Sequence, residues 1–185
     1  MPPLRELLGI TSGPVAWREA SVSLVGGFVA IAAVLLTSQQ VLGLTGVFAL
    51  VASTGASTVL LFAVPHGPLS QPWPLLGGQT ISAVIGVTCA ARLGPTTTAA
   101  AAALGLSLCA MHLLRCVHPP GGASALVAVL GGDAVRALGY SFVVRPVLLN
   151  AGTLLVVALV FNNLFGWRRY PAALRRRPEP GPVGA

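Results

Sequence analysis

Six apolar segments follow one another along most of the chain, and this succession limits the possible folds more than any other feature of the sequence. They lie at about residues 21–37, 42–64, 75–91, 97–117, 121–132 and 141–165. Four of them approach or exceed the ~20 residues that a helix needs to cross a hydrocarbon core of about 30 Å, whereas the fifth is too short. Only 8% of all residues are charged, against about a quarter in soluble domains. The sequence therefore predicts an all-α, polytopic membrane protein in a lipid bilayer.

The positive charge of the chain is concentrated near its ends. The formal net charge is +7, and five of the eleven cationic residues, Arg168, Arg169 and Arg175–Arg177, follow the last apolar segment. Basic residues beside membrane spans usually mark the cytoplasmic side. We therefore expect both termini in the cytoplasm, with Arg5 and Arg18 at the other end of the chain, and no nucleic-acid partner. We expect the membrane to be the inner (plasma) membrane of a bacterium.

Two of the apolar segments resemble each other. The stretch "GASTVLLFAV" at 55–64 is similar to "GASALVAVLG" at 122–131, and a proline, Pro74 or Pro146, opens the segment that follows each of them. This predicts an internal duplication, with repeat one at about 42–92 and repeat two at about 97–165, although small residues also match by chance in membrane helices. If both short segments cross the bilayer, six spans form two inverted halves, and if both re-enter, four spans form two parallel halves. We favour six.

Three regions follow from this reading. Residues 1–20 form an N-terminal interfacial segment, for which a disordered leader is the alternative. Residues 21–167 form the transmembrane domain. Residues 168–185 form a basic, disordered cytoplasmic tail.

The stretch "RCVHPPGGASALVAVLGG" at 115–132 places charged and helix-breaking residues inside the apolar sequence. Proline suits the first turn of a helix and tends to end the helix before it. A short helix should therefore start at Pro119 or Pro120, with its first backbone N–H groups lacking a partner and carrying the positive end of the helix dipole. Such donors in a membrane need a partner, and an anion would satisfy them.

Two short or broken helices, at Ser53–Ser57 and His118–Ser124, are thus expected to converge on one anion site. Arg115 would supply the attracting charge beside it, because an arginine near an apolar interior normally faces a cavity, a counter-charge or the interface. The expected substrate-binding residues are Arg115, His118, Gly121, Gly122, Ala123, Ser124, Gly55, Ser57 and Thr58. The alternative is an ordinary Pro-Gly turn at the membrane surface, with Arg115 reaching the headgroups.

Other polar residues give weaker indications. Cys109, His112 and Cys116 share a helix face and are able to ligate a soft metal, but packing against a neighbouring helix is favoured. Gln79, Thr80 and Asn150 either line a pathway or bond across helices. Asp133 and Arg136 are expected to form a local pair. No Gly-x-Ser-x-Gly or His-Glu-x-x-His motif is present, so we predict no catalytic residues, metal or cofactor, and no enzyme activity.

The sequence "MHLLRCVHPPGGASALVAVLGG", together with "GASTVLLFAVPHGPLSQPWPLLGGQTISAVIGV" and "PVLLNAGTLLVVALVFNN", resembles the HPP family of integral membrane proteins. The resemblance covers about residues 45–165, and its most specific part is His118–Ala123. It implies a membrane protein of several helices. Members in photosynthetic organisms are regarded as nitrite transporters of the chloroplast envelope, so the resemblance also implies nitrite as a substrate.

These observations lead to one functional hypothesis and its alternatives. The protein is expected to be a transporter or channel for a small monovalent anion, nitrite or nitrate first, bound at the start of the helix that follows His118. A non-transporting sensor or scaffold, or a transporter of another small solute or metal ion, is the alternative. Small residues on the fourth segment also suit a homo-oligomer.

Overall fold

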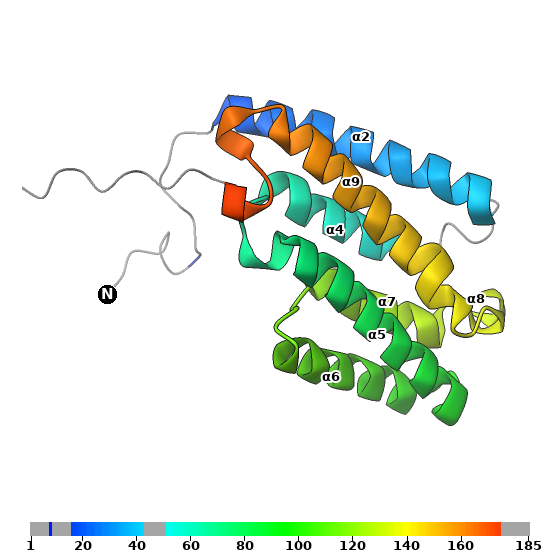
Figure 1. Cartoon of the computed structure of the whole chain (residues 1–185). Coiled ribbons are helices and arrows are strands. Elements are labelled where there is room, and N and C mark those ends of the chain that lie inside the picture. Colours follow the sequence, from blue (N-terminus) through cyan, green and yellow to red (C-terminus); the bar gives the residue numbers. More distant parts are fainter. Residues whose placement is uncertain (1–7, 9–15, 43–50, 175–185) are drawn as a thin grey trace, which may run out of the picture.

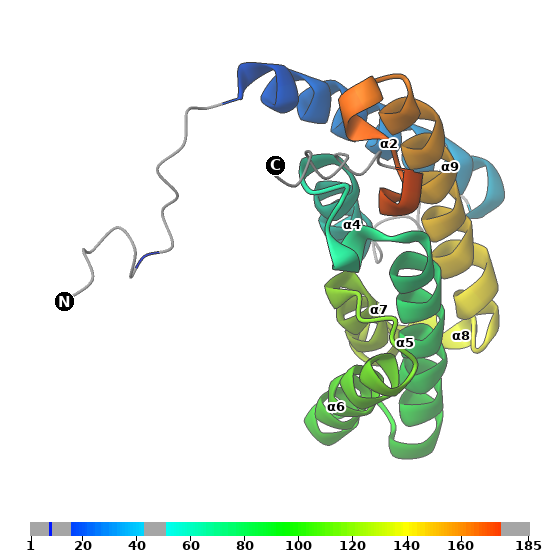
Figure 2. The ribbon, with the colours of Figure 1, turned by 60° about the vertical axis from the view of Figure 1, so that its left-hand side comes forward.

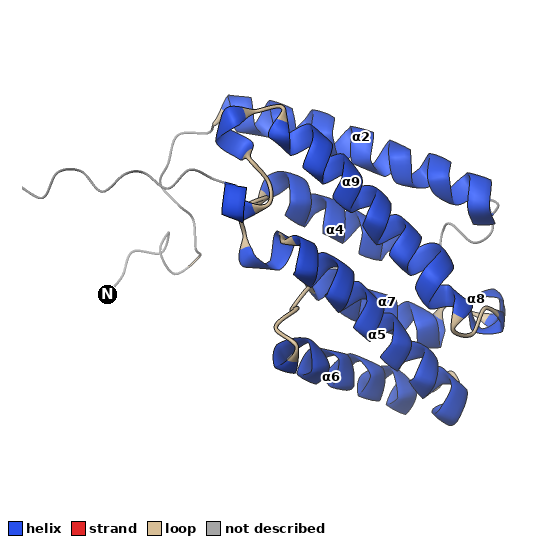
Figure 3. Ribbon diagram, in the orientation of Figure 1, coloured by secondary structure: helices blue, strands red, loops and turns tan. Residues whose placement is uncertain are grey.

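The computed structural model describes residues 8, 16–42 and 51–174, and every regular element in these ranges is helical (Figure 3). This confirms the all-α class. The main helices are α2 (Trp17–Leu42), α4 (Val51–Ala63), α5 (Pro72–Leu93), α6 (Thr97–Leu113), α7 (Pro119–Leu130) and α9 (Leu149–Asn163). Shorter elements are η2 (Pro68–Ser70), α8 (Asp133–Ala137), the π-helical η3 (Val143–Leu148), η4 (Gly166–Arg168) and η5 (Ala172–Leu174).

Each of the six predicted apolar segments contains a helix in its described residues, but the helices differ in length. Trp17–Gln40, Pro72–Leu93 and Val143–Asn163 are long and apolar enough to cross a membrane. The two shortest main helices are α4, with 13 residues, and α7, with 12. At 1.5 Å per residue each of these is only about 20 Å long, less than the thickness of the hydrocarbon core. They are the two helices that contain the repeated "GAS" stretch.

Successive main helices run in alternating directions (Figure 1). As a result, α2 begins and α9 ends at the same end of the bundle, which we call the terminal end. Side-chain contacts agree with this placement, because Trp167 Nε1 donates to a carboxylate oxygen of Glu19 at 3.1 Å and the guanidinium of Arg18 lies over the Trp167 ring. Six helices that cross a membrane one after another must alternate in direction, and the first must begin on the side where the last ends. The six main helices meet both conditions.

The packing of the helices supports the internal duplication, with α2, α4 and α5 as one half and α6, α7 and α9 as the other, so the first half begins before the predicted repeat at 42–92. Helix α4 packs against α2 and α9, and α7 packs in the same way against α6 and α5. Helix α2 lies on α9, as α6 lies on α5, so the first helix of each half contacts the third helix of the other half. The two short helices meet in the middle, while α2 and α6 occupy opposite edges in both views (Figures 1 and 2).

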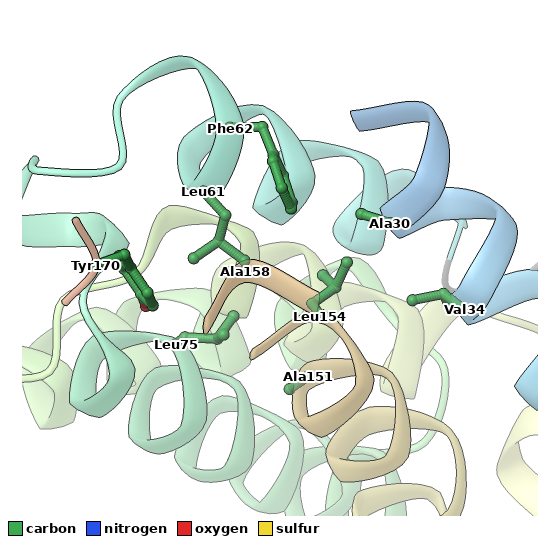
Figure 4. Packing of buried hydrophobic residues seen from close by; sticks show 9 residues of the cluster. All are labelled: Ala30, Val34, Leu61, Phe62, Leu75, Ala151, Leu154, Ala158 and Tyr170. Carbon is green, nitrogen blue, oxygen red and sulfur yellow. The ribbon is translucent and has the colours of Figure 1, made fainter. Parts of the chain in front are cut away.

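Large apolar side chains cover the outside of the bundle. Leu24 and Phe28 on α2, Leu113 at the end of α6, and Val160 on α9 are each more than half exposed. Such a surface is stable in lipid and costly in water. One apolar core lies among α2, α4, α5 and α9, and Figure 4 shows its members: Ala30, Val34, Leu61, Phe62, Leu75, Ala151, Leu154, Ala158 and Tyr170.

Helices α5 and α7 approach each other through glycines. A methyl group added at Gly86 of α5 would lie 2.6 Å from the carbonyl oxygen of Ala125, and one added at Gly121 of α7 would lie 2.6 Å from that of Gly78. Small residues at a helix interface allow such close backbone contact, which stabilises helix pairs in membranes through packing. The pair α5 and α7 therefore forms the tightest part of the bundle.

The residues after α9 return to the bundle, which corrects the expectation of a disordered tail from residue 168 onward. Tyr170 is fully buried, and its hydroxyl donates to the carbonyl of Ser70 at 2.7 Å. Residues 168–174 therefore belong to the folded domain, because they fill space beside α4 and α5; residues 175–185 lie outside the described residues. At the other end, α2 begins at Trp17, inside the predicted interfacial segment, of which residues 1–7 and 9–15 lie outside the described residues.

Arg168 holds three chain segments together at the terminal end. Its guanidinium is 1% exposed, forms an ion pair with Glu19, and donates to Asn162 Oδ1 at 3.1 Å and to the carbonyl of Phe62 at 2.6 Å. Burial lowers the pKa of Arg168, while the Glu19 carboxylate raises it. The ends of α2, α4 and α9 are thus joined by one fully satisfied cation.

The glycine contacts predict that Gly86→Ala destabilises the bundle by about 1–3 kcal/mol, because the new methyl group meets the Ala125 backbone. The matched control is Gly105→Ala on the exposed face of α6, where an added methyl group meets nothing within 4 Å and alanine favours the helix by about 1 kcal/mol. Thermal unfolding in detergent measures both. Equal melting temperatures for the two variants would contradict this account of the interface.

The role of Arg168 predicts that Arg168→Gln costs about 1–3 kcal/mol, because Asn162 and the buried Phe62 carbonyl lose a charged donor, while the Glu19 side chain is 36% exposed and stays solvated. The neighbouring Arg169 is exposed, so Arg169→Gln serves as the control and should change stability by less than about 0.5 kcal/mol. Unfolding of both variants in the same detergent decides the matter. A small effect of Arg168→Gln would mean that the ion pair does not hold the helix ends.

Candidate functional site

Five buried polar side chains meet where α4, α5 and α7 come together in the middle of the bundle. We call them the polar cluster: Ser53 and Ser57 of α4, Gln79 of α5, His118 at the start of α7, and Ser124 within α7. None of them is more than 5% exposed. Buried polar groups in a membrane protein must find partners inside the protein, because lipid offers none.

The amide of Gln79 is the centre of the cluster. Its Nε2 donates to Ser53 Oγ at 3.0 Å and to Ser57 Oγ at 3.1 Å, and its Oε1 accepts from Ser124 Oγ at 2.5 Å. One side chain of α5 thus connects hydroxyl groups of both short helices. This orientation of the Gln79 amide agrees with the rest of the network. In the flipped orientation the amide oxygen would face the hydroxyls of Ser53 and Ser57, whose hydrogens are donated to other acceptors.

His118 extends the cluster toward the terminal end. Its Nδ1 lies 2.9 Å from the carbonyl oxygen of Leu69, and its Nε2 lies 2.9 Å from Ser57 Oγ. Because a carbonyl oxygen only accepts, Nδ1 carries the hydrogen and donates it to Leu69. In the neutral imidazole Nε2 then accepts from the Ser57 hydroxyl.

Ser53 joins the cluster to the backbone of α7. Its hydroxyl lies 2.8 Å from the carbonyl oxygen of Pro120 and 2.8 Å from Ser124 Oγ. These contacts are possible because α4 and α7 cross closely with only small residues between them.

A small cavity lies beside the cluster, toward α9. Its lining residues are Ser53, Thr54, Ser57, Gln79, Ser124, Val147, Asn150, Ala151 and Leu154. The cavity has a volume of about 10 Å³, which is room for a single water molecule. On its far side Asn150 Oδ1 accepts from Ser38 Oγ of α2 at 2.6 Å. Polar side chains therefore continue from His118 past the cavity to α2.

The structure brings some of the predicted site residues together and leaves others apart. His118, Ser57 and Ser124 lie in the polar cluster, and Gly121 and Gly122 are buried next to it. Arg115 is exposed in the loop before α7, with a backbone φ of 54°. Ala123 and Gly55 are half-buried, and Thr58 donates its hydroxyl to the Thr54 carbonyl of its own helix. Arg115, Ala123, Gly55 and Thr58 therefore make none of the cluster's hydrogen bonds.

The hydrogen bonds of the cluster come from side-chain donors, whereas the sequence predicts backbone N–H groups at the start of α7 as the donors for an anion. Both first residues of α7, Pro119 and Pro120, lack an N–H, and the N–H of Gly121 already donates to the His118 carbonyl at 2.8 Å. The expected short helix at Ser53–Ser57 is present, but it runs unbroken through these residues. Helix α4 therefore contributes the hydroxyls of Ser53 and Ser57, which are four residues apart on one helix face, and not the N–H groups of a second helix N-terminus.

Three polar residues matter more than the sequence indicates. Ser53 was outside the predicted set, although its spacing from Ser57 places both on one face of α4. Gln79 and Asn150 bond across helices, as one of the two readings predicts, and both also line the cavity. Thr80 bonds only within α5. Nothing in the sequence distinguishes Ser38 from other serines.

The weaker predictions have clear outcomes. Cys109 and His112 are exposed while Cys116 is buried, and the described part of the chain holds no group of three metal-ligating side chains. Asp133 and Arg136 form the predicted ion pair.

Comparison with known proteins identifies the family. Residues 12–171 match the model of the HPP transmembrane region. One transmembrane protein of Dictyostelium discoideum is 34% identical over 83% of this chain and 50% of its own length, and another is 40% identical over 66% of this chain and 44% of its own length. The chain thus spans about half the length of these curated relatives, and no solved structure matches it. The match over most of the chain, on a helical bundle with membrane-spanning helices, shows that this protein is an integral membrane protein of the HPP family.

Proposed function

We propose that the protein is a transporter or channel for a small monovalent anion, with nitrite and nitrate as the first candidates. The observation that carries the proposal is the polar cluster, in which five buried side chains adjoin a cavity inside a bundle with an apolar exterior. Polar groups inside membrane proteins are costly and commonly mark a solute path. Nitrite transport, which the family resemblance implies, belongs to the same class.

The chemistry of the cluster suits a small oxyanion. The oxygens of nitrite and nitrate only accept hydrogen bonds, while the hydroxyls of Ser53, Ser57 and Ser124 rotate and the Gln79 amide supplies two further hydrogens. An anion in the cavity is able to take over these donors from their present partners. Because the cavity has room for about one water molecule, entry of the anion requires α4 or α9 to move away from the cluster.

An anion fits the cluster better than a metal cation. The chain has four acidic residues, Glu6, Glu19, Asp133 and Glu179, and none of them belongs to the polar cluster. Hard cations bind carboxylates and carbonyl oxygens, and softer ones need several thiolates or imidazoles. The cluster offers one imidazole and neutral donors. We assign it no catalytic role.

A non-transporting scaffold is the second candidate, and one observation favours it. In the described arrangement the hydrogens of the cluster are paired internally, as they would be in a network that only holds three helices together. The two functions predict different effects when a single cluster hydroxyl is lost. A transporter loses more anion flux than stability, whereas a scaffold loses stability only.

We further propose that the protein spans the inner membrane of a bacterium. Both ends of the domain then face the cytoplasm. Of the described arginines, Arg18, Arg115, Arg168 and Arg169 belong to the terminal end and Arg92, Arg136 and Arg145 to the other. In the sequence, Arg5 precedes α2, and Arg175–Arg177 follow α9. A basic excess on one side marks the cytoplasm. Assembly into a homo-oligomer stays a prediction.

Anion transport predicts that Ser124→Ala lowers nitrite and nitrate uptake into proteoliposomes about tenfold, because it removes a hydroxyl that donates to the charged anion, at a cost of about 1.5 kcal/mol. The matched control is Ser107→Ala on α6. Ser107 is also fully buried, but its hydroxyl has no partner among the described residues.

The control should transport like the unmodified protein, and chloride and formate serve as competing anions in the same assay. Equal uptake by the two serine variants, with both folded, would contradict the assignment of the cluster. The absence of nitrite and nitrate uptake by the unmodified protein would favour the scaffold.

We propose that Arg115, which is exposed, attracts the anion from solution without contacting it in the cluster. Arg115→Gln should then raise KM about twofold to threefold at low ionic strength, and the effect should fade near 0.15 M salt, where the Debye length is about 8 Å. Arg92→Gln, an exposed arginine at the other end of the bundle, is the control for external uptake in oriented vesicles. A fall in kcat that salt does not relieve would place Arg115 in the transport step.

A further inference from the structure

His118 has hydrogen bonds that define its protonation state. The Leu69 carbonyl fixes the hydrogen on Nδ1, and the Ser57 hydroxyl donates to Nε2. Neither partner is charged. The imidazole is fully buried, and a positive charge on it would have no counter-charge nearby. It is therefore neutral in this arrangement.

No other ionisable side chain shares this environment. Helices α4 and α7 and the η2 turn contain no titratable residue, and α5 has only Cys89 and Arg92, both at its far end. On the segment before α7, Cys116 is buried and Arg115 is exposed. On that side, Tyr170 bonds to Ser70 of η2, and His66, in the turn before η2, lies with its Nε2 3.1 Å from the carbonyl oxygen of Arg169. Both ion pairs of the described residues, Arg136 with Asp133 and Arg168 with Glu19, lie elsewhere.

The hydrogen bonds around His118 leave no place for an added proton. Ser57 gives its only hydrogen to Nε2 and accepts one from the Gln79 amide. If Nε2 becomes protonated it turns into a donor, Ser57 has to accept from it, and the Ser57 hydrogen loses its acceptor. The cluster then has one donor too many and one positive charge in an apolar interior.

A monovalent anion removes both problems together. Its lone pairs accept the released Ser57 hydrogen, and its charge balances the imidazolium. The cavity that would hold it is lined by Ser57 and Gln79, the same groups that connect to His118. Proton and anion therefore each make the binding of the other more favourable, which is a reciprocal coupling of two sites.

We propose that His118 is a proton-binding site and that the protein carries one proton together with each anion. This inference rests on the proposed anion transport through the same cluster. In the step, a proton from water forms the Nε2–H bond, the Ser57 hydroxyl turns from Nε2 to the anion, and the neutral pair crosses. On the other side the Nε2–H bond breaks and the proton returns to water with the anion.

Nitrate is the probe that tests this coupling, because nitric acid is a strong acid and no neutral form leaks through lipid. Proteoliposomes with a pH-sensitive dye inside receive an inward nitrate gradient, with the membrane potential set by potassium and valinomycin. The lumen should acidify by one proton for each nitrate taken up, the rate should rise as the external pH falls, and it should not respond to the potential.

The variant His118→Gln, which keeps a hydrogen-bonding side chain that does not titrate, should lose nitrate-driven acidification and the pH dependence of uptake. His112→Gln makes the same change at an exposed histidine of α6 and should behave like the unmodified protein. Gel filtration and thermal unfolding in detergent check that both variants are folded. If His118→Gln does not fold, the stoichiometry and potential dependence of the unmodified protein decide alone.

The two proposals fail in different ways. Nitrate uptake that follows the membrane potential and leaves the lumen pH unchanged would overturn the coupling and leave anion transport intact. Acidification that persists in folded His118→Gln would assign the proton to another group and also overturn it. If neither nitrate nor nitrite enters the vesicles, the transport proposal fails and the coupling fails with it.

Discussion

The amide of Gln79 is the interaction on which the centre of this bundle depends. Helices α4 and α7 bring serine hydroxyls into the apolar interior of the bundle, where lipid offers no partner. Gln79 provides two donors and an acceptor at the point where the hydroxyls of both helices meet. A single side chain of α5 thus satisfies groups from three positions and fixes how the short helices lie against each other. The same groups form the wall of the cavity, so fold and proposed site share one set of hydrogen bonds.

The duplicated architecture explains why the short helices meet in the middle. Each half has an outer helix, a short helix and a third helix, and the third helix of one half packs on the first helix of the other. This exchange brings α4 and α7 together while α2 and α6 remain at the edges. Polar residues at equivalent positions of the two short helices, Ser57 and Ser124, therefore face a common space. A site between repeats is the usual arrangement in transporters built from duplicated halves.

The sequence was sufficient to predict the helical membrane fold, the short helix after His118 and the pairing of the two "GAS" stretches, because hydropathy and proline positions act locally. It did not predict which polar groups meet. Gln79 is one of several polar residues within spans, and its central place depends on how α5 packs on α7 and how α7 in turn meets α4. Arg115 is close to His118 in sequence, but a left-handed backbone conformation in the loop leaves it exposed. The burial of Arg168 depends on Glu19, which lies at the opposite end of the sequence, and local patterns carry no information about such a pairing.

The glycine contacts between α5 and α7 bring their backbones together, with mostly small side chains between them. Two helices joined in this way have no freedom to slide or part without losing their whole interface at once. They act as a single stiff body that carries Gln79, His118 and Ser124 along with it. Any rocking motion that admits a solute must then occur across the other boundary of the cluster, where α4 and α9 meet this body through hydroxyl groups and small aliphatic side chains that are able to re-pair.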